Sequence, residues 1–438
     1  MGSSPRADRK SNGFDMKDRK PRLLFLAYDF PPIKNIGCVR AYNIAKWLTR
    51  KGWEVTVVTP HESAWWRTSS AADLHEDLSR RGIRCIRTPH RWRWLLPPSS
   101  ESRKFSLAWA AGGVTRRVAA FLAIERETGW IREAAKACAG LNPDDVDVVL
   151  VSGPPFASFG LARRVARRLG RPYVIDYRDL WTGNPHAKRA APQRRIERER
   201  EILAASAAAT GVSPSLRESL RQQFGTGNSV HVVSNGYDPE EMARVPPHDF
   251  GHFAIVYAGM FYPPKRTAGP LMAALQRVEQ LVGKELPWTF HYYGYDTEYV
   301  LSCAREFQVG HRVVAHGNVP RSEALSAVRG ANVAVVISSI YEKASLQDKG
   351  IVTGKVFEAI GLGTPLLVIA PEGSDLEGVL QLTRLGRRFS GVDPEGMAQF
   401  LVHSMNHGAA TDTSPEPFSW ENIVSQLDGV LREAVAAK

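Results

Sequence analysis

The chain alternates short, continuous apolar runs with stretches whose apolar residues recur every three to four positions. The first sixty residues contain an apolar run at 23–28, a stretch in which Ile44, Trp47 and Leu48 share one helical face, and a second run at 54–59. Runs that are apolar throughout are typical of parallel strands covered on both faces. The opening segment is therefore predicted to form a strand, a helix and a second strand.

This alternation continues through most of the chain, with a polar stretch after Val233 that contains Pro246 and Pro247. Before that stretch, further strands are predicted at 146–152, 173–176, 209–212 and 231–233. After it, strands are predicted at 253–257, 288–293, 313–316, 333–337 and 365–369, with helices at 269–282, 321–329 and 354–361. The fold class is therefore α/β, with two doubly wound, Rossmann-like domains facing across a cleft.

The pattern divides the 438 residues into five segments. Residues 1–20 are polar and charged and are expected to be a disordered leader, and 21–238 form the first domain. Residues 239–250 are the linker, 251–410 the second domain, and 411–438 a tail whose amphipathic helix is expected to pack back across the domains. Two domains of about 200 residues suit a chain of this length.

A block rich in tryptophan and arginine, residues 65–130, interrupts the alternation. It holds six of the eleven tryptophans, together with several basic residues. This composition suits peripheral contact with an anionic membrane, where indole rings lie at headgroup depth and cations meet acidic lipids. Alternatively, the tryptophans pack a helical insertion against the first domain. The sequence leaves both interpretations open.

The charge balance favours an anionic partner. There are 57 Lys and Arg residues against 45 Asp and Glu, a net charge of +12, and the stretch 161–201 holds twelve basic and five acidic residues. The four cysteines lie far apart, which predicts neither a disulfide framework nor a zinc site. The longest apolar run, 359–370, is too short to span a bilayer, and the first twenty residues lack the apolar core of a secretory signal. A cytoplasmic protein without a nucleic-acid partner is expected.

In doubly wound domains, ligands bind at the carboxyl ends of the strands, so the loops after strands carry the candidate residues. In the first domain, Gly37 follows a strand and precedes a helix, where it either lets a phosphate or sugar approach the backbone or serves the turn. Arg178 and Asp179 close another strand. Charges there are costly unless they face a cleft or pair, so they are site residues or a structural ion pair.

The second domain repeats this arrangement. Its candidates are Gly259, Lys265 and Arg266 after the first strand, and Gly354, Lys355 and Glu358 at the start of a later helix. A helix N-terminus with glycine and lysine suits a diphosphate, and a carboxylate one turn later suits the hydroxyls of a ribose. Alternatively, Glu358 caps the helix or pairs with Lys355.

Together these segments resemble the GT-B glycosyltransferases of family 4, retaining enzymes that use nucleotide sugars. The resemblance covers nearly the whole chain from Pro21. Its motifs are the glycine loop from Asp29 to Arg40 and the segments 176–181, 234–238, 317–323 and 355–365.

The resemblance implies a role for each candidate. Arg178 and Asp179 would act in the cleft, and Lys265 and Arg266 would act on the leaving diphosphate. Glu358 would bind the ribose, and the donor-binding set would be completed by Gly37, Arg40, Gly259, Gly354 and Lys355. The first domain would bind a glycan, lipid-linked or small-molecule acceptor. No metal and no other cofactor is expected, because cations and helix dipoles neutralise the leaving group.

Two positions depart from the family pattern. Gly350 stands where relatives often have a glutamate, eight residues before the ribose-binding one, and Phe159 stands where many have a histidine. Phe159 offers no hydrogen bond, so a sugar pocket lined by it would favour a donor with an apolar C6 group. Alternatively, Phe159 belongs to the core.

Two other function classes remain open on the same architecture. A nucleotide-sugar 2-epimerase would need acid and base groups in the cleft, which the segment 176–181 fits poorly. A catalytically dead GT-B protein would bind glycans or anionic surfaces through its basic stretch.

Overall fold

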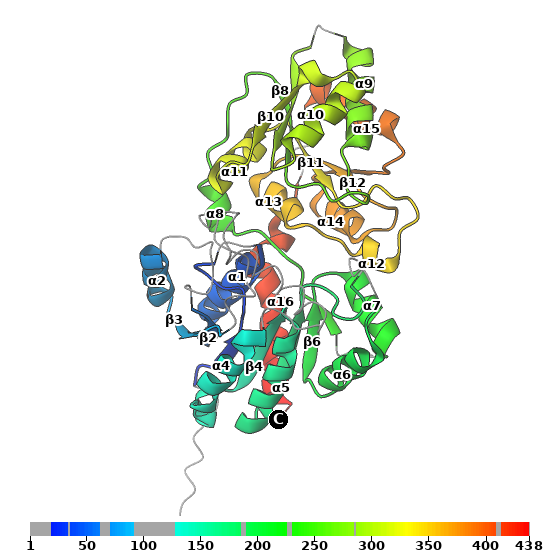
Figure 1. Cartoon of the computed structure of the whole chain (residues 1–438). Helices are drawn as coiled ribbons and strands as arrows, with labels where there is room; N and C mark the ends of the chain where they lie inside the picture. Colours follow the sequence, from blue (N-terminus) through cyan, green and yellow to red (C-terminus); the bar gives the residue numbers. More distant parts are fainter. Residues whose placement is uncertain are drawn as a thin grey trace, which may run out of the picture.

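The computed structural model describes residues 19–33, 36–61, 71–91, 128–184, 190–225, 230–283, 286–408 and 413–437. Two α/β domains stack end to end, each built on a parallel sheet (Figure 1). This arrangement confirms the predicted fold class. Residues 1–18 of the expected leader and most of the block 65–130 lie outside the described residues. None of the described helices is long and apolar enough to cross a membrane.

The first sheet has seven strands in the order β3-β2-β1-β4-β5-β6-β7. The strands are β1 (Arg22–Leu26), β2 (Glu54–Pro60), β3 (Ile83–Thr88), β4 (Val148–Gly153), β5 (Tyr173–Tyr177), β6 (Ala208–Gly211) and β7 (Val230–Val232). At the centre, Leu24 lies opposite Thr56 on one side and Val149 on the other. The prediction missed β3, which lies inside the block 65–130. This strand forms the edge of the sheet, where Arg84 is exposed, and its two arginines leave it without an apolar run.

The helices of this domain lie on both faces of the sheet. They are α1 (Ile36–Arg50), α2 (Ala71–Arg80), α4 (Thr128–Ala139), α5 (Ala157–Leu169), α6 (Gln193–Ala204) and α7 (Pro214–Phe224), with a short 3-10 turn at Pro143–Asp145. Right-handed crossovers put the helices after β1 and β2 on one face and those after β4 and β5 on the other. Accordingly, Ile131 of α4, Val165 of α5 and Ile202 of α6 share one core, whereas Ile44 of α1 belongs to another.

The C-terminal helix α16 (Trp420–Ala436) returns to the first domain. It packs beside α1 and across β4, β5 and β6, on the face opposite α5 and α6 (Figure 1). Ile423, Leu427 and Leu431 are buried there, on the face that their spacing indicated. The indole of Trp53 donates a hydrogen bond of 2.6 Å to Asp428 of this helix.

The second sheet has six strands in the order β10-β9-β8-β11-β12-β13. They are β8 (Phe253–Ala258), β9 (Trp288–Tyr293), β10 (Val313–Gly317), β11 (Val333–Ile337), β12 (Leu366–Ile369) and β13 (Gly386–Phe389). The helices are α8 (Pro239–Ala243) in the linker, α9 (Gly269–Val282), α10 (Thr297–Glu306), α11 (Arg321–Gly330), α12 (Leu346–Lys349), α13 (Gly354–Leu362), α14 (Asp375–Thr383) and α15 (Pro394–His407). Short 3-10 turns lie at Gly310–Arg312 and Glu416–Phe418.

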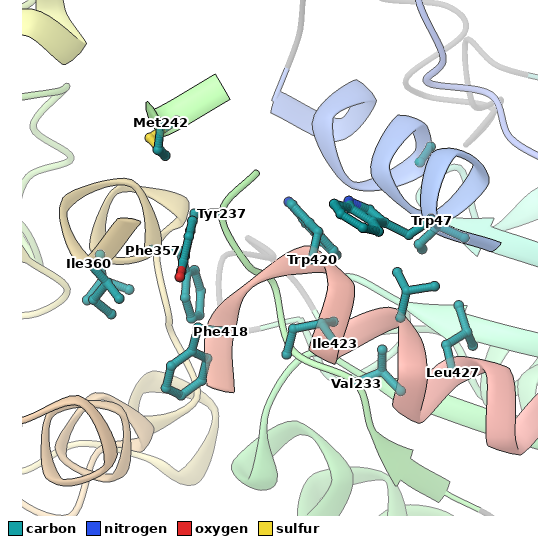
Figure 2. Packing of buried hydrophobic residues seen from close by; sticks show 14 of the residues in the cluster. Trp47, Val233, Tyr237, Met242, Phe357, Ile360, Phe418, Trp420, Ile423 and Leu427 are labelled. Atoms are coloured by element: carbon teal, nitrogen blue, oxygen red, sulfur yellow. The ribbon is translucent and has the colours of Figure 1, made fainter. Parts of the chain in front are cut away.

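One hydrophobic core continues from domain to domain. Trp47 of α1 and Leu427 of α16 belong to the same cluster as Tyr237 after β7, Phe357 of α13 and Phe418 before α16 (Figure 2). The chain crosses between the domains here, and the backbone of Tyr237 bonds to that of Phe418 at 2.9 Å. This shared core joins the two domains and forms the floor of the space between them.

Candidate functional site

A cavity of about 480 Å³ lies between the two domains. Six of the residues predicted from the sequence lie in its wall: Gly37, Arg40, Arg178, Asp179, Gly354 and Glu358. Tyr237 and Trp420, from the two segments that join the domains, line it as well. The cavity thus brings together the loops after the first-domain strands and the start of α13.

Arg178 is both an ion-paired residue and a wall residue. Its Nη2 lies 2.8 Å from the carboxylate of Asp29, and its Nε donates to the carbonyl of Gly153 at 3.2 Å. The guanidinium lies over the first turn of α1, where a Cβ on Gly37 would be only 2.0 Å from Nη1. Gly37 therefore leaves room for the side chain of Arg178, a close approach that only glycine allows.

Arg40 lies in the cavity wall, but its hydrogen bonds favour a structural role over the predicted donor-binding role. It is 3% exposed, and all five of its N–H groups are used. Nε and Nη2 donate to Asp176 at 3.0 and 2.6 Å, and Nη2 also donates to the carbonyl of Val233 at 2.9 Å. Nη1 donates to the carbonyl of Ser234 at 2.8 Å and to the side chain of Asn235 at 3.2 Å. Arg40 therefore ties the sheet to the segment that leaves the first domain.

Asp176 is the buried partner of Arg40. It is completely buried, and its carboxylate also accepts hydrogen bonds from Ser152 and Thr210 at 2.8 Å each. Burial opposes ionisation, but the guanidinium and the two hydroxyls outweigh it and hold the pKa of Asp176 below its usual range. The segment 176–181 therefore starts with a structural ion pair and continues with the wall residues Arg178 and Asp179.

Positive charge gathers where α13 begins. Lys355 makes no hydrogen bond or ion pair with any residue that the structure describes, and its carbon chain lies where a Cβ on Gly259 would come within 2.5 Å. Burial lowers the pKa of Lys355, the negative charge of Glu358 opposes this shift, and Arg266 and Arg321 add to it. Arg266 lies over the ring of Tyr262 at 5.2 Å, with its Nε buried and without a partner among the described residues.

Lys265 differs from its neighbour Arg266 because it is already paired. Its Nζ lies 2.6 Å from Asp348 of α12, whose other oxygen accepts the hydroxyl of Ser345 at 2.8 Å. Burial opposes ionisation of Asp348, but Lys265 and Ser345 hold its pKa below the usual range. Unlike Gly354, the predicted residues Gly259, Lys265, Arg266 and Lys355 are not part of the cavity wall. No group of three His, Cys, Asp or Glu within the described ranges is placed to hold a metal ion.

Glu358 faces the cavity and pairs with Arg321 rather than with Lys355. Arg321 donates to Glu358 through Nη1 and to both carboxylate oxygens of Glu241 at 3.2 Å. Glu358 nevertheless keeps about a fifth of its side chain exposed (20%), and Arg321 lines the same wall. Arg321 is not among the residues predicted from the sequence, although it lies inside the segment 317–323 that resembles the family motif.

Phe159 lies in the core, which corrects its assignment to a sugar pocket. Its side chain is fully buried, with ring centroids 4.9 Å from Tyr177, 5.6 Å from Phe156 and 6.0 Å from Trp181. It is not part of the cavity wall. The first turn of α5 directs the ring toward the sheet, so Phe159 says nothing about the C6 group of a sugar.

Gly350 lies where the two domains touch. A Cβ there would be 3.1 Å from Cβ of Ser215 and 3.3 Å from Oγ of Ser213, both at the start of α7. Beside it, Asp375 of the second domain accepts the backbone N–H of Ser215 at 3.0 Å and its hydroxyl at 2.8 Å. A side chain at position 350 would therefore require the start of α7 to shift by a few tenths of an ångström, and Gly350 itself lies in the cavity wall.

Two facing Rossmann-like domains, a charged cavity between them and a last helix that returns to the first domain define the GT-B fold of glycosyltransferases. Residues 38–236 match the family model described as the glycosyl transferase 4-like domain. The match lies in the first domain and covers less than half of the chain, and there it agrees with the resemblance to family 4 GT-B glycosyltransferases. No curated protein matches the chain.

Solved structures of glycosyltransferases share the whole fold. Sucrose-phosphate synthase from Thermosynechococcus elongatus is 16% identical with a TM-score of 0.64, and the match covers 95% of this chain and 100% of that one. HepE from Anabaena, solved in complex with UDP, is 13% identical with a TM-score of 0.59 over 94% and 99% of the two chains. The lipopolysaccharide outer core galactosyltransferase WaaB is 13% identical with a TM-score of 0.56 over 94% and 99%. At these identities the likeness establishes the fold.

Proposed function

We propose that this protein is a retaining, metal-independent glycosyltransferase that uses a nucleoside diphosphate sugar. One observation carries the proposal: in the described part of the chain, neither Lys355 in the first turn of α13 nor Arg266 after β8 forms a hydrogen bond or an ion pair with a carboxylate, and Nε of Arg266 is buried without a partner. The hydroxyl of Thr353, just before the helix, is also buried without a hydrogen bond there. A diphosphate would supply acceptors for these groups and meet the positive end of the helix dipole.

The carboxylate of Glu358 supports the same donor. It lies one turn into α13 and faces the cavity, so a diphosphate at the helix start would bring a ribose close to it. Arg321 holds one of its oxygens, which orients the group. Hydrogen bonds from two ribose hydroxyls to a carboxylate are charge-assisted and therefore strong.

The proposed reaction transfers the sugar with retention. The bond between the anomeric carbon and the diphosphate oxygen breaks, and the acceptor hydroxyl attacks the same face of the sugar. Its proton passes to the departing diphosphate oxygen. Lys265, Arg266 and Lys355 stabilise the negative charge that develops on the diphosphate, so no covalent nucleophile is needed.

Arg178 and Asp179 are proposed to act on the opposite side of the cavity. Both lie in its wall, and Arg178 is held there by Asp29. The acceptor, a glycan, lipid-linked or small molecule, would enter along this first-domain wall. HepE structures titled as complexes with UDP and with UDP-glucose support a uridine diphosphate sugar as the first donor to test here.

Peripheral contact with an anionic membrane at a cytoplasmic location is part of the proposal for a lipid-linked acceptor. Among the tryptophans of the block 65–130, the structure describes Trp130, which is fully buried against Tyr28 and therefore supports the packing interpretation at that position. The exposed arginines 163, 164 and 167 of α5 are basic groups that could meet acidic lipids. Flotation with acidic vesicles should show binding that rising salt removes, and binding that is absent or insensitive to salt would exclude this contact.

The decisive experiment compares Lys355→Met with a matched control. Wild type should release nucleoside diphosphate from one member of a nucleotide-sugar panel only when an acceptor is present. Lys355→Met should lower turnover by about a hundredfold, because it removes a charge that acts on the leaving group. Lys136→Met, which removes an exposed lysine of α4, should change nothing. Full turnover in Lys355→Met would place the diphosphate elsewhere.

A further inference from the structure

Exposed tyrosines lie on the loops that follow β8, β9 and β11 and in the first turn of α10. The large exposed side chains there are Met260 (42%), Tyr262 (52%), Tyr295 (57%), Tyr299 (36%) and Tyr341 (39%). In the rest of the described chain, the large exposed apolar side chains are Leu281, Leu286, Val314, Leu382 and Val392, all aliphatic. Among the described residues, the large exposed aromatic side chains are therefore confined to this region. We call the four tyrosines and the neighbouring Met260 the tyrosine rim (residues 260, 262, 295, 299 and 341).

Hydrogen bonds and close packing hold the first two of these loops together. A Cβ on Gly294 would lie 2.2 Å from the carbonyl oxygen of Gly259, so the backbones touch. The carboxylate of Asp296 accepts the backbone N–H of Phe261 at 2.9 Å. The hydroxyl of Tyr299 accepts a hydrogen bond of 3.0 Å from the backbone N–H of Ala268. These loops therefore form one surface rather than separate tips.

The third loop joins the same surface and leads to the cavity. The backbone N–H of Ile340, next to Tyr341, donates to the carbonyl of Lys265 at 2.9 Å. The side chain of Lys265 pairs with Asp348 of α12. Gln347 in the same helix lines the cavity between the domains. The third loop thus links the tyrosine rim, through Lys265 and α12, to the proposed diphosphate site and to one residue of the cavity wall.

The chemistry of the rim suits a carbohydrate. A tyrosine ring has an apolar face and a polar hydroxyl edge, and a pyranose ring likewise has an apolar C–H face and an edge of hydroxyls. The rim offers four such rings, and the guanidinium of Arg266 lies over one of them, Tyr262. Exposed apolar side chains concentrated beside a ligand cavity mark an interaction site.

We propose that the tyrosine rim binds the sugars of a neutral oligosaccharide acceptor that extend beyond the reacting residue. This inference rests on the proposed glycosyltransferase function, because the acceptor must reach the cavity. It narrows the acceptor class to a glycan of several sugars. Stacking on two or more rings lets consecutive sugars contribute, so longer acceptors bind more tightly than short ones.

The test measures glycan binding without a donor. The full chain is titrated with maltoheptaose, cellohexaose, laminarihexaose and chitohexaose, and with the disaccharide of each, by calorimetry. One hexamer or heptamer should bind at least about tenfold more tightly than its disaccharide. Tyr262→Ala and Tyr295→Ala should each weaken binding by about five- to tenfold, whereas Tyr262→Phe should keep most of it. Leu382→Ala, which removes an exposed aliphatic side chain of α14, should have no effect.

Three results would overturn the proposal. The first is that no member of the panel binds. The second is binding that both alanine variants leave unchanged. The third is a wild-type dimer that Tyr262→Ala dissociates, which would make the rim a contact between two copies of the chain. Chain-length-dependent binding without sugar transfer from any donor would instead contradict the proposed function and leave the rim as a glycan-binding surface.

Discussion

Replacing Arg40 with methionine tests whether this arginine holds the fold or binds the donor. The variant keeps the length of the side chain but leaves the completely buried Asp176 without its cation. Breaking a buried ion pair by removing one partner costs about 3–5 kcal/mol, because the remaining charge stays buried. For a domain of this size each kcal/mol lowers Tm by about 2–4 °C, so Tm should fall by about 6–20 °C.

The assay combines thermal unfolding with calorimetric titration of UDP below the melting transition. Because every N–H of Arg40 already has a partner in the first domain, UDP affinity of the folded variant should change by less than about threefold. The double variant Arg40→Met/Asp176→Asn also removes the unpaired buried charge of Asp176 and should recover part of the lost stability. A stable Arg40→Met protein with UDP affinity reduced tenfold or more would refute the structural role and restore Arg40 to the donor site.

Three further predictions concern the cavity and its surroundings. Glu358→Ala should weaken UDP binding by about ten- to a hundredfold, and Glu358→Asp should weaken it less. Equal calorimetric affinities of the wild type for UDP and for its 2′,3′-dideoxy analogue would contradict the assignment of Glu358 to the ribose. Gly350→Glu should force α7 and α12 apart and lower turnover far more than Gly350→Ala does. If the glutamate variant keeps its turnover and its small-angle scattering profile, the contact between α7 and α12 is dispensable. The hydrogen bond from Lys46 holds the pKa of Glu240 near about 2, below its unfolded value of 4.5, so this pair stabilises the fold above pH 4.5 and the stabilisation is lost as the pH falls toward 2. Urea midpoints measured across that range should fall less steeply for Glu240→Gln, and identical profiles would count against the pair.

The central strands and several helices follow from local sequence. The runs at 288–293 and 333–337 coincide with β9 and β11, because a strand covered on both faces must be apolar throughout. The sequence pattern did not predict the strands β3 and β13, because they lack a continuous apolar run. Both lie at the edge of a sheet, where Arg84 and Arg387 are exposed, and the arginines interrupt the apolar run.

For the candidate site, local sequence indicated the loops but not the partners of each side chain. Gly37, Arg178 and Glu358 lie in the cavity wall as their positions after strands and at a helix start suggested. Phe159 is buried in the core rather than in the cavity wall, and the N–H groups of Arg40 are bonded within the first domain. Asp176, the partner of Arg40, is 136 residues away in the chain, and no local sequence pattern predicts that contact.

The last helix separates most clearly what sequence and tertiary structure decide. The spacing of Ile423, Leu427 and Leu431 was sufficient to predict an amphipathic helix with one buried face. Which surface that face covers depends on the topology of a sheet formed some two hundred residues earlier. Because right-handed crossovers put α5 and α6 on one face of β4, β5 and β6, the opposite face stays uncovered until α16 packs against it. The apolar pattern therefore determined that the helix must be buried, and only the handedness of the crossovers decided where.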